Sequence, residues 1–122
     1  MRRKTICIDG EEHLLCYSVN AMIAVQEHFA DGDLGAARFD GSVTDNFNNA
    51  LWMISVLMRA GAEYAALRGL ENKKPISEEE LRVLVGPDDL GELIGAIADT
   101  ISAGSKRNIE LESSKNQTAT RA

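Results

Sequence analysis

The sequence predicts a mainly helical α+β domain, in which an N-terminal β-hairpin is followed by about four helices. Three observations support this fold class. Apolar residues alternate with polar ones between Lys4 and Tyr17, whereas beyond Ser18 they recur at helical spacing. Glycine and proline then divide most of the remaining chain into helix-sized segments. The last segment, 105–122, is polar and has no helical periodicity.

The hairpin is expected to turn at Asp9-Gly10, because this dipeptide favours tight turns and glycine tolerates positive φ. Apolar residues alternate with polar or small neighbours on both sides of the turn, and we expect them to face the core: Ile6, Ile8, Leu14 and Cys16.

The first helix should begin just after Tyr17, with Ser18 or Asn20 as its N-cap. Its apolar side is expected to consist of Val19, Met22, Ile23 and Phe29, and its wet side of Gln26, Glu27 and His28. The next segment, 30–42, is rich in turn-forming residues and reads as a loop held by two apolar anchors, Leu34 and Phe39.

A long helix is predicted from a Thr44 N-cap to about Arg68, closed by Gly69. One apolar stripe should form its core face: Phe47, Leu51, Ile54, Met58 and Ala65, flanked by Ala50, Leu57, Gly61 and Ala62. A second stripe lies close to the opposite side: Met53, Val56, Ala60 and Leu67, with Trp52 at its edge.

Two interpretations of this second stripe stay open. Either it offers a groove to a partner, with Trp52, Met53, Val56 and Leu67 as the exposed contact residues, or it is buried beneath the hairpin or the last helix.

Two more helices complete the domain. Ser77 and Glu80 match a capping box, and Leu81, Leu84 and Val85 give that short helix an apolar side before Gly86-Pro87 stops it. The last helix should start at Asp88 or Asp89 and end at Gly104, with apolar residues at Leu90, Ile94, Ile97, Ala98 and Ile101.

These boundaries give a hairpin-plus-helical domain over 1–104 and a flexible polar tail over 105–122. The chain carries a net charge of −6, and the tail carries +2, so the domain carries −8. An acidic domain disfavours nucleic acid, whose phosphates require clustered basic residues. The N-terminal Arg2-Arg3-Lys4 triplet is interpreted as a solvated arm.

No catalytic, cofactor or metal signature occurs, so an enzyme is not expected. His13 and His28 lack a second ligand at metal spacing and are interpreted as exposed or half-buried surface histidines. The acidic clusters 78–80 and 88–89 are explained by their position in first helical turns. Cys7 and Cys16 are expected to be reduced, packed thiols. Without a signal peptide or an apolar run near the roughly 20 residues that span a bilayer, we expect a cytoplasmic protein with no membrane partner.

The order of these motifs resembles the small tail assembly chaperones of long-tailed, siphovirus-type bacteriophages and prophages. Such proteins begin with a strand, a glycine-containing turn and a second strand, here marked by Lys4, Ile6, Ile8, Gly10, Leu15 and Tyr17. The Asn20-Ala21 helix start and Phe29 follow, and then a long helix around 50–53. The resemblance covers about residues 4–104.

If the resemblance holds, it implies a protein that binds and solubilises the tape measure protein and helps recruit tail tube subunits. Such a chaperone works in the host cytoplasm and is absent from the mature virion. The resemblance leaves open whether the protein forms a homo-oligomer. The family often makes a longer product by ribosomal frameshifting, and codons for 114–116 could contain a slippery run. Two alternatives remain: a structural head–tail connector or tail completion protein, and a small bacterial regulatory adaptor.

Overall fold

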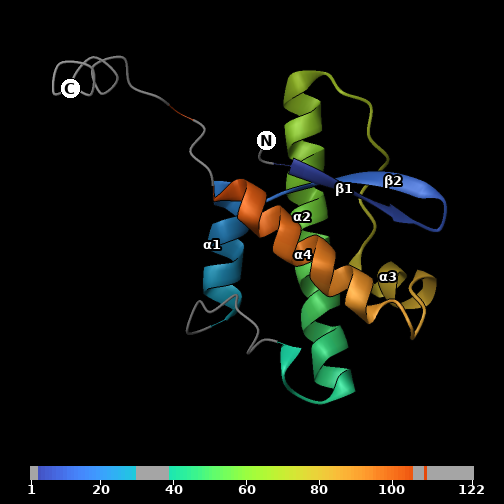
Figure 1. Ribbon diagram of the computed structural model, residues 1–122. Helices are drawn as coiled ribbons and strands as arrows, with labels where there is room; N and C mark the ends of the chain where they lie inside the picture. Colours follow the sequence, from blue (N-terminus) through green and yellow to red (C-terminus); the bar gives the residue numbers. More distant parts are fainter. Residues whose placement is uncertain (1–2, 30–38, 106–108, 110–122) are drawn as a thin grey trace, which may run out of the picture.

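The computed structural model describes residues 3–29, 39–105 and 109. Its elements are β1 (Arg3–Ile8), β2 (Glu11–Cys16), α1 (Val19–His28), α2 (Val43–Arg68), α3 (Glu78–Leu84) and α4 (Leu90–Gly104). The predicted N-terminal hairpin and four helices with a long central one are confirmed. The hairpin and α4 lie across the long helix α2, and α1 runs beside it (Figure 1). The anchor Leu34 and almost all of the expected tail lie outside the described residues.

The hairpin turns where the sequence predicts. Asp9 and Gly10 both adopt positive φ, of 50° and 81°, as a two-residue primed turn requires, and the strands pair antiparallel with Ile8 opposite Glu11. The predicted inward set needs correction, because His13 and Leu15 are buried on β2 while Leu14 is only half-buried. Cys16 is buried as expected, and both α2 and α4 contact its strand β2.

Helix α1 begins at the predicted cap: the Ser18 hydroxyl accepts a hydrogen bond from the Ala21 N–H at 3.2 Å. Its predicted apolar side is wrong for three residues. Val19, Met22 and Ile23 are exposed, whereas Ala21 and Val25 face the core. Burial of Phe29 and exposure of the Gln26, Glu27 and His28 side are confirmed.

Helix α2 starts one residue before the predicted cap. Ser42, not Thr44, is the N-cap, and its hydroxyl accepts from the Asp45 N–H at 3.1 Å. The end is as predicted, with Gly69 at a φ of 66° after Arg68. The core stripe is confirmed at Leu51, Ile54, Met58 and Ala65, while Phe47 is half-buried.

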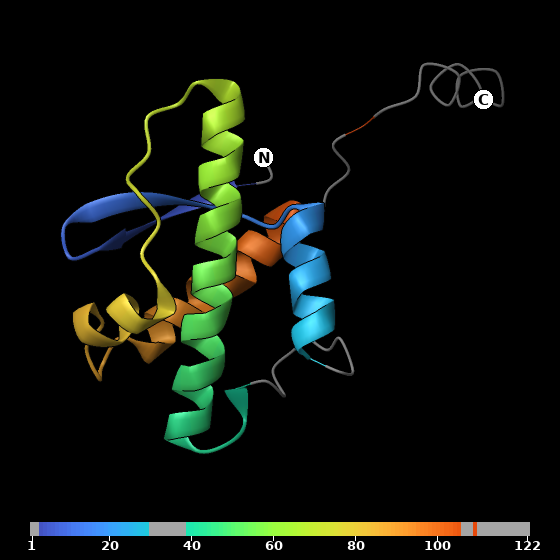
Figure 2. The ribbon, with the colours of Figure 1, turned by 180° about the vertical axis from the view of Figure 1, so that it is seen from behind.

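A connector then runs back from the end of α2, past the hairpin, to α3 (Figure 2). It is fixed at two points: Asn72 Oδ1 accepts from the Leu14 N–H at 3.0 Å, and the Ile76 N–H lies 3.2 Å from Met58 Sδ. The predicted capping box on α3 is confirmed, because Ser77 and Glu80 each accept a backbone hydrogen bond from the other.

Helix α4 lies within the predicted limits, but its inward face is rotated from the predicted stripe. Leu93, Ile97, Thr100 and Ala103 are buried, whereas Leu90, Ile94 and Ile101 are half-buried and Ala98 is exposed. Thr100 satisfies its buried hydroxyl by donating to the Ala96 carbonyl at 2.7 Å. The periodicity therefore placed the helix correctly and its buried face only approximately.

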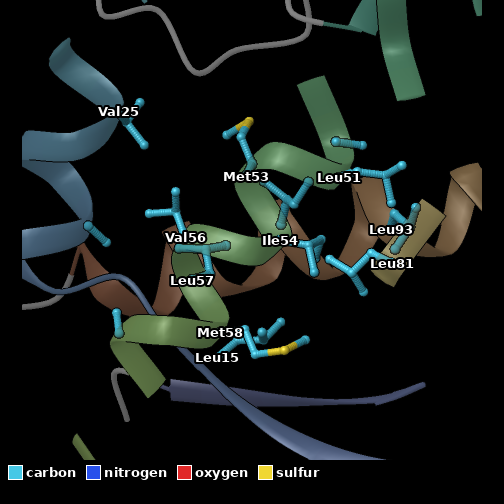
Figure 3. Packing of buried hydrophobic residues seen from close by; sticks show 14 of the residues in the cluster. Leu15, Val25, Leu51, Met53, Ile54, Val56, Leu57, Met58, Leu81 and Leu93 are labelled. Carbon is cyan, nitrogen blue, oxygen red and sulfur yellow. The ribbon is translucent and has the colours of Figure 1, made fainter. Parts of the chain in front are cut away.

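The core is centred on the middle of α2. Side chains from the hairpin, α1, α3 and α4 converge on it, as the labelled residues show (Figure 3): Leu15, Val25, Leu51, Met53, Ile54, Val56, Leu57, Met58, Leu81 and Leu93. One helix thus supplies more than half of the labelled set, and this explains why α2 is apolar on more than one side.

Candidate functional site

The four residues proposed as a partner-binding surface are separated by the fold. Met53 and Val56 expose 1% and 3% of their surface and belong to the core. Leu67 exposes 86%, and Trp52 is half-buried against the core. The expectation that Met53 and Val56 are exposed is therefore wrong, and the alternative that they are buried is correct for these two residues.

The helix that lies over Met53 and Val56 is α1. Val25 points toward both residues in Figure 3, and Ala21 and Ala24 line the same small crevice as Val56. Helix α1 of the same chain thus covers the second stripe of α2 at these two residues. The hairpin and α4, which the sequence offered as covering elements, are not needed there.

Both ends of α1 are fastened to α2 by polar or aromatic contacts. At the C-terminal end, the His28 ring stacks on Trp52 with 3.6 Å between centroids, and Phe29 meets Trp52 edge-on at 5.5 Å. At the N-terminal end, Asn20 Nδ2 donates to Glu63 Oε1 at 3.5 Å. Trp52 is therefore an anchor for α1 as well as a surface residue.

The opposite side of α1 carries three large apolar side chains in contact with solvent. Val19, Met22 and Ile23 expose 64%, 39% and 46% of their surface and lie at positions i, i+3 and i+4, on one side of the helix. We call these three residues the α1 outer face. Leu67 lies one turn beyond Glu63 on α2, on the side of α2 that meets the first turn of α1.

The periodicity of this segment contained the signal for both faces. Ala21, Val25 and Phe29 recur every four residues, and this spacing is as helical as that of the α1 outer face. Periodicity alone therefore does not distinguish the two faces. In the fold, Ala21, Val25 and Phe29 pack into the core, and the α1 outer face is left exposed.

The His13 side chain is fully buried, so its interpretation as an exposed or half-buried surface histidine is wrong. Neither ring nitrogen makes a hydrogen bond within the described part of the chain, and Glu11 Oε1 lies 3.8 Å from Nε2. Burial lowers the pKa of His13 from its ordinary value of 6.5, although the Glu11 charge acts in the opposite direction. His28, in contrast, is exposed as expected.

The two cysteines occupy different environments. The register places Cys7 opposite Glu12 and Cys16 opposite Arg3, so they lie about 13 Å apart along the hairpin, too far for a disulfide. Cys16 is packed in the core as predicted, whereas Cys7 is exposed, which corrects the expectation of two packed thiols.

The described residues contain no group of three or more His, Cys, Asp or Glu side chains arranged to hold a metal ion. No helix among residues 3–29 and 39–105 combines the length and apolar character needed to cross a membrane.

The apolar outer surface of α1 is therefore the strongest candidate for a partner site near the predicted residues. No protein-family model, no curated protein and no solved structure matches this chain.

Proposed function

We propose that this protein is a tail assembly chaperone of a long-tailed bacteriophage or prophage. In this proposal it binds the tape measure protein in the host cytoplasm, keeps it soluble, helps recruit tail tube subunits, and leaves before the virion is complete. The observation that carries the proposal is the exposed apolar outer face of α1, joined to an element order that fits the resembling family.

The α1 outer face suits a helical partner. Three apolar side chains at i, i+3 and i+4 form a short ridge, and an amphipathic helix can pack its own apolar stripe against such a ridge. Burial of this surface contributes about 25 cal/mol per Å² of apolar area removed from water. Met22 adds adaptability, since its flexible thioether fits partners of varied sequence.

The residues proposed to bind the partner differ from the four that the sequence predicts. Trp52 and Leu67 remain accessible beside the two ends of α1, while Met53 and Val56 lie beneath that helix. A partner helix would therefore contact the outer side of α1 and reach Leu67 at one end. It would not have to enter the second stripe of α2.

Co-expression with the tape measure protein of the same phage or prophage tests the proposal. We expect the wild-type chain to raise the soluble yield of that protein and to co-purify with it. Ile23→Asp should abolish both effects while keeping the helical circular dichroism and urea midpoint of the wild type. Val83→Asp is the matched control, because Val83 is 83% exposed on the distant helix α3.

Two results would contradict the proposal. One is full activity of Ile23→Asp, and the other is an equal loss with Val83→Asp, which would show that the effect is not specific to α1. Mass spectrometry of purified virions separates the structural alternative, because a head–tail connector or completion protein stays in the particle and a chaperone does not.

A further inference from the structure

Among the described residues, no strand pairs with the outer edge of β1. The Leu14 N–H bonds to Asn72 and not to its cross-strand neighbour Thr5, so Leu14 and Thr5 form a pair whose backbone groups point away from each other. Because this pattern alternates along an antiparallel ladder, the N–H and C=O groups of Cys7 also point outward. The sheet formed by the described residues contains only β1 and β2, so no third strand meets this edge.

A groove lies along this edge, between β1 and α4. Its volume is about 580 Å³, and it is lined on one side by residues 4–9 and on the other by the exposed side of α4 with the end of α3. Ile6, Leu84 and Ala96 contribute apolar surface. Thr5 and Cys7, whose backbone groups point outward, are both exposed.

Two glycines on α4 keep the groove open. Gly91 and Gly95 lie one helical turn apart and both line it. A Cβ atom built at either glycine would meet no atom within 4 Å. Neither glycine is therefore required for packing within this chain, although each weakens the helix relative to alanine. Their effect is to leave space where a larger side chain would fill the groove.

The charged residues that line the groove are mostly acidic. Asp9, Asp89, Glu92 and Asp99 are opposed by Lys4 alone, which leaves a net charge of −3. Asp89 Oδ2 already accepts a hydrogen bond from the Gly86 N–H at 2.8 Å. The other acidic groups are available to a ligand that carries positive charge.

We propose that this groove binds an extended, basic segment of a partner protein, which adds as a third strand to β1. Thr5 and Cys7 each offer one N–H and one C=O to such a strand, and its alternate side chains would face the apolar lining. Lysine or arginine on the segment would pair with Glu92 and Asp99. Hydrogen bonds between the open edge and the peptide backbone provide the affinity. The negative charge of the groove disfavours acidic segments.

This proposal is independent of the α1 outer face. The groove residues lie on β1, α3 and α4, and none of them belongs to α1. Variants of the groove therefore leave the proposed helix-binding surface intact, and each proposal can fail without the other.

The test uses a fluorescent peptide of about eight alternating valine and lysine residues, blocked at both ends, with a valine–glutamate peptide as its counterpart. Binding to the full chain is followed by fluorescence anisotropy. We expect Gly95→Leu to weaken binding of the lysine peptide at least tenfold, because the leucine side chain fills the groove. We expect the same of Cys7→Pro, which removes an outward N–H from an edge strand, where proline is tolerated.

Cys7→Ser is the matched control, since it changes the side chain but keeps the N–H, and it should bind within twofold of the wild type. All three variants keep the net charge, so a loss of affinity cannot come from general electrostatic attraction. Circular dichroism and urea unfolding verify that each variant is folded. If Cys7→Pro unfolds, Thr5→Pro provides the same test at the other outward position.

Three results would overturn the proposal: equal binding of the two peptides, unchanged binding by Gly95→Leu and Cys7→Pro, or no binding of the lysine peptide to the full chain. Binding that appears only after truncation at Ser105 would assign the groove to the chain's own basic C-terminal segment. A dimer that Gly95→Leu converts to monomer would assign it to a second copy.

Discussion

The environment of single residues in this protein is determined by neighbours that are distant in sequence. His13 lies on a hairpin strand next to Glu11 and Glu12, and such a polar context suggests a solvated position. The structure buries it completely, and this burial lowers its pKa, while the Glu11 carboxylate acts to raise the pKa and the Lys73 ammonium to lower it. A neutral imidazole is tolerated there at the cost of two ring nitrogens without hydrogen bonds among the described residues.

This burial predicts a pH-dependent stability. The pKa of His13 is lowered below 6.5 in the folded chain, so the unfolded chain binds a proton more readily. The stability that the neutral His13 contributes is fully present above about pH 6.5, the ordinary pKa. It is lost as the pH falls from about 6.5 toward the lower pKa of the folded chain. Urea midpoints measured between pH 7.5 and 5 should show the loss, and His13→Leu should remove it.

His28→Gln serves as the control for this experiment because it removes the other histidine, and it should keep the loss of stability that His13 causes. An unchanged slope in His13→Leu would show that other groups titrate in this range.

The start of α2 provides a second test at the residue scale. Ser42→Ala should lower the free energy of unfolding by about 1 kcal/mol, because it removes the hydroxyl that accepts from the Asp45 N–H. Thr44→Ala should be neutral or slightly stabilising, since Thr44 lies exposed inside the first turn and alanine has the higher helix propensity. Chemical denaturation of both variants measures the difference, and a larger loss from Thr44→Ala would contradict the assigned cap.

At the scale of elements, close approach of the hairpin to α2 determines how the two pack. Gly61 lies in the interior of α2, directly against the Leu14 carbonyl group, and a Cβ atom at this position would overlap that backbone. In the sequence, Gly61 flanks the predicted core stripe, and its spacing alone does not indicate a special function. The structure shows that it sets the distance between helix and strand.

Gly61→Ala should therefore destabilise the protein by about 1–3 kcal/mol through overpacking, despite the better helix propensity of alanine. Gly95→Ala is the matched control, because a Cβ there meets open space, and it should stabilise the protein by about 0.5–1 kcal/mol. Thermal and urea unfolding compare the two. If the hairpin could shift freely away from α2, Gly61→Ala would not destabilise the protein.

Element α1 shows why helical periodicity predicts a helix more reliably than its buried face. Its apolar residues form two sets at helical spacing, one being the α1 outer face and the other consisting of Ala21, Val25 and Phe29. Both sets satisfy the periodicity, so only the packing of the second set in the core decided between them. The side chains of the α1 outer face are consequently left for solvent or a partner.

At the scale of the whole molecule, the long helix α2 is the centre around which every other element is arranged (Figures 1 and 2). Its two apolar stripes are both used inside the domain over most of its length. Within the second stripe, Met53, Val56 and Ala60 are buried, Trp52 at its edge is half-buried, and Leu67 near the C-terminal end of the helix is exposed.

Truncation of the second stripe should reveal this division. Met53→Ala is expected to cost about 2–5 kcal/mol of stability, because it leaves a cavity beneath α1. Leu67→Ala should change stability by less than about 0.5 kcal/mol, since its side chain is exposed. If Leu67→Ala weakens co-purification with the tape measure protein while Met53→Ala only lowers stability, the partner surface begins where the core ends. Equal stability losses would contradict the division.

The sequence by itself determined the element types, most of their limits, the hairpin turn and the α3 capping box. These features depend on local chemistry, namely periodicity, glycine at positive φ and hydroxyl caps, and local chemistry is legible in a single chain. Only the tertiary structure decided that α1 covers Met53 and Val56, that His13 is buried, and that β1 keeps an open edge beside α4. Each of these depends on which surfaces approach one another closely, and that choice follows from side-chain volumes brought together across the fold.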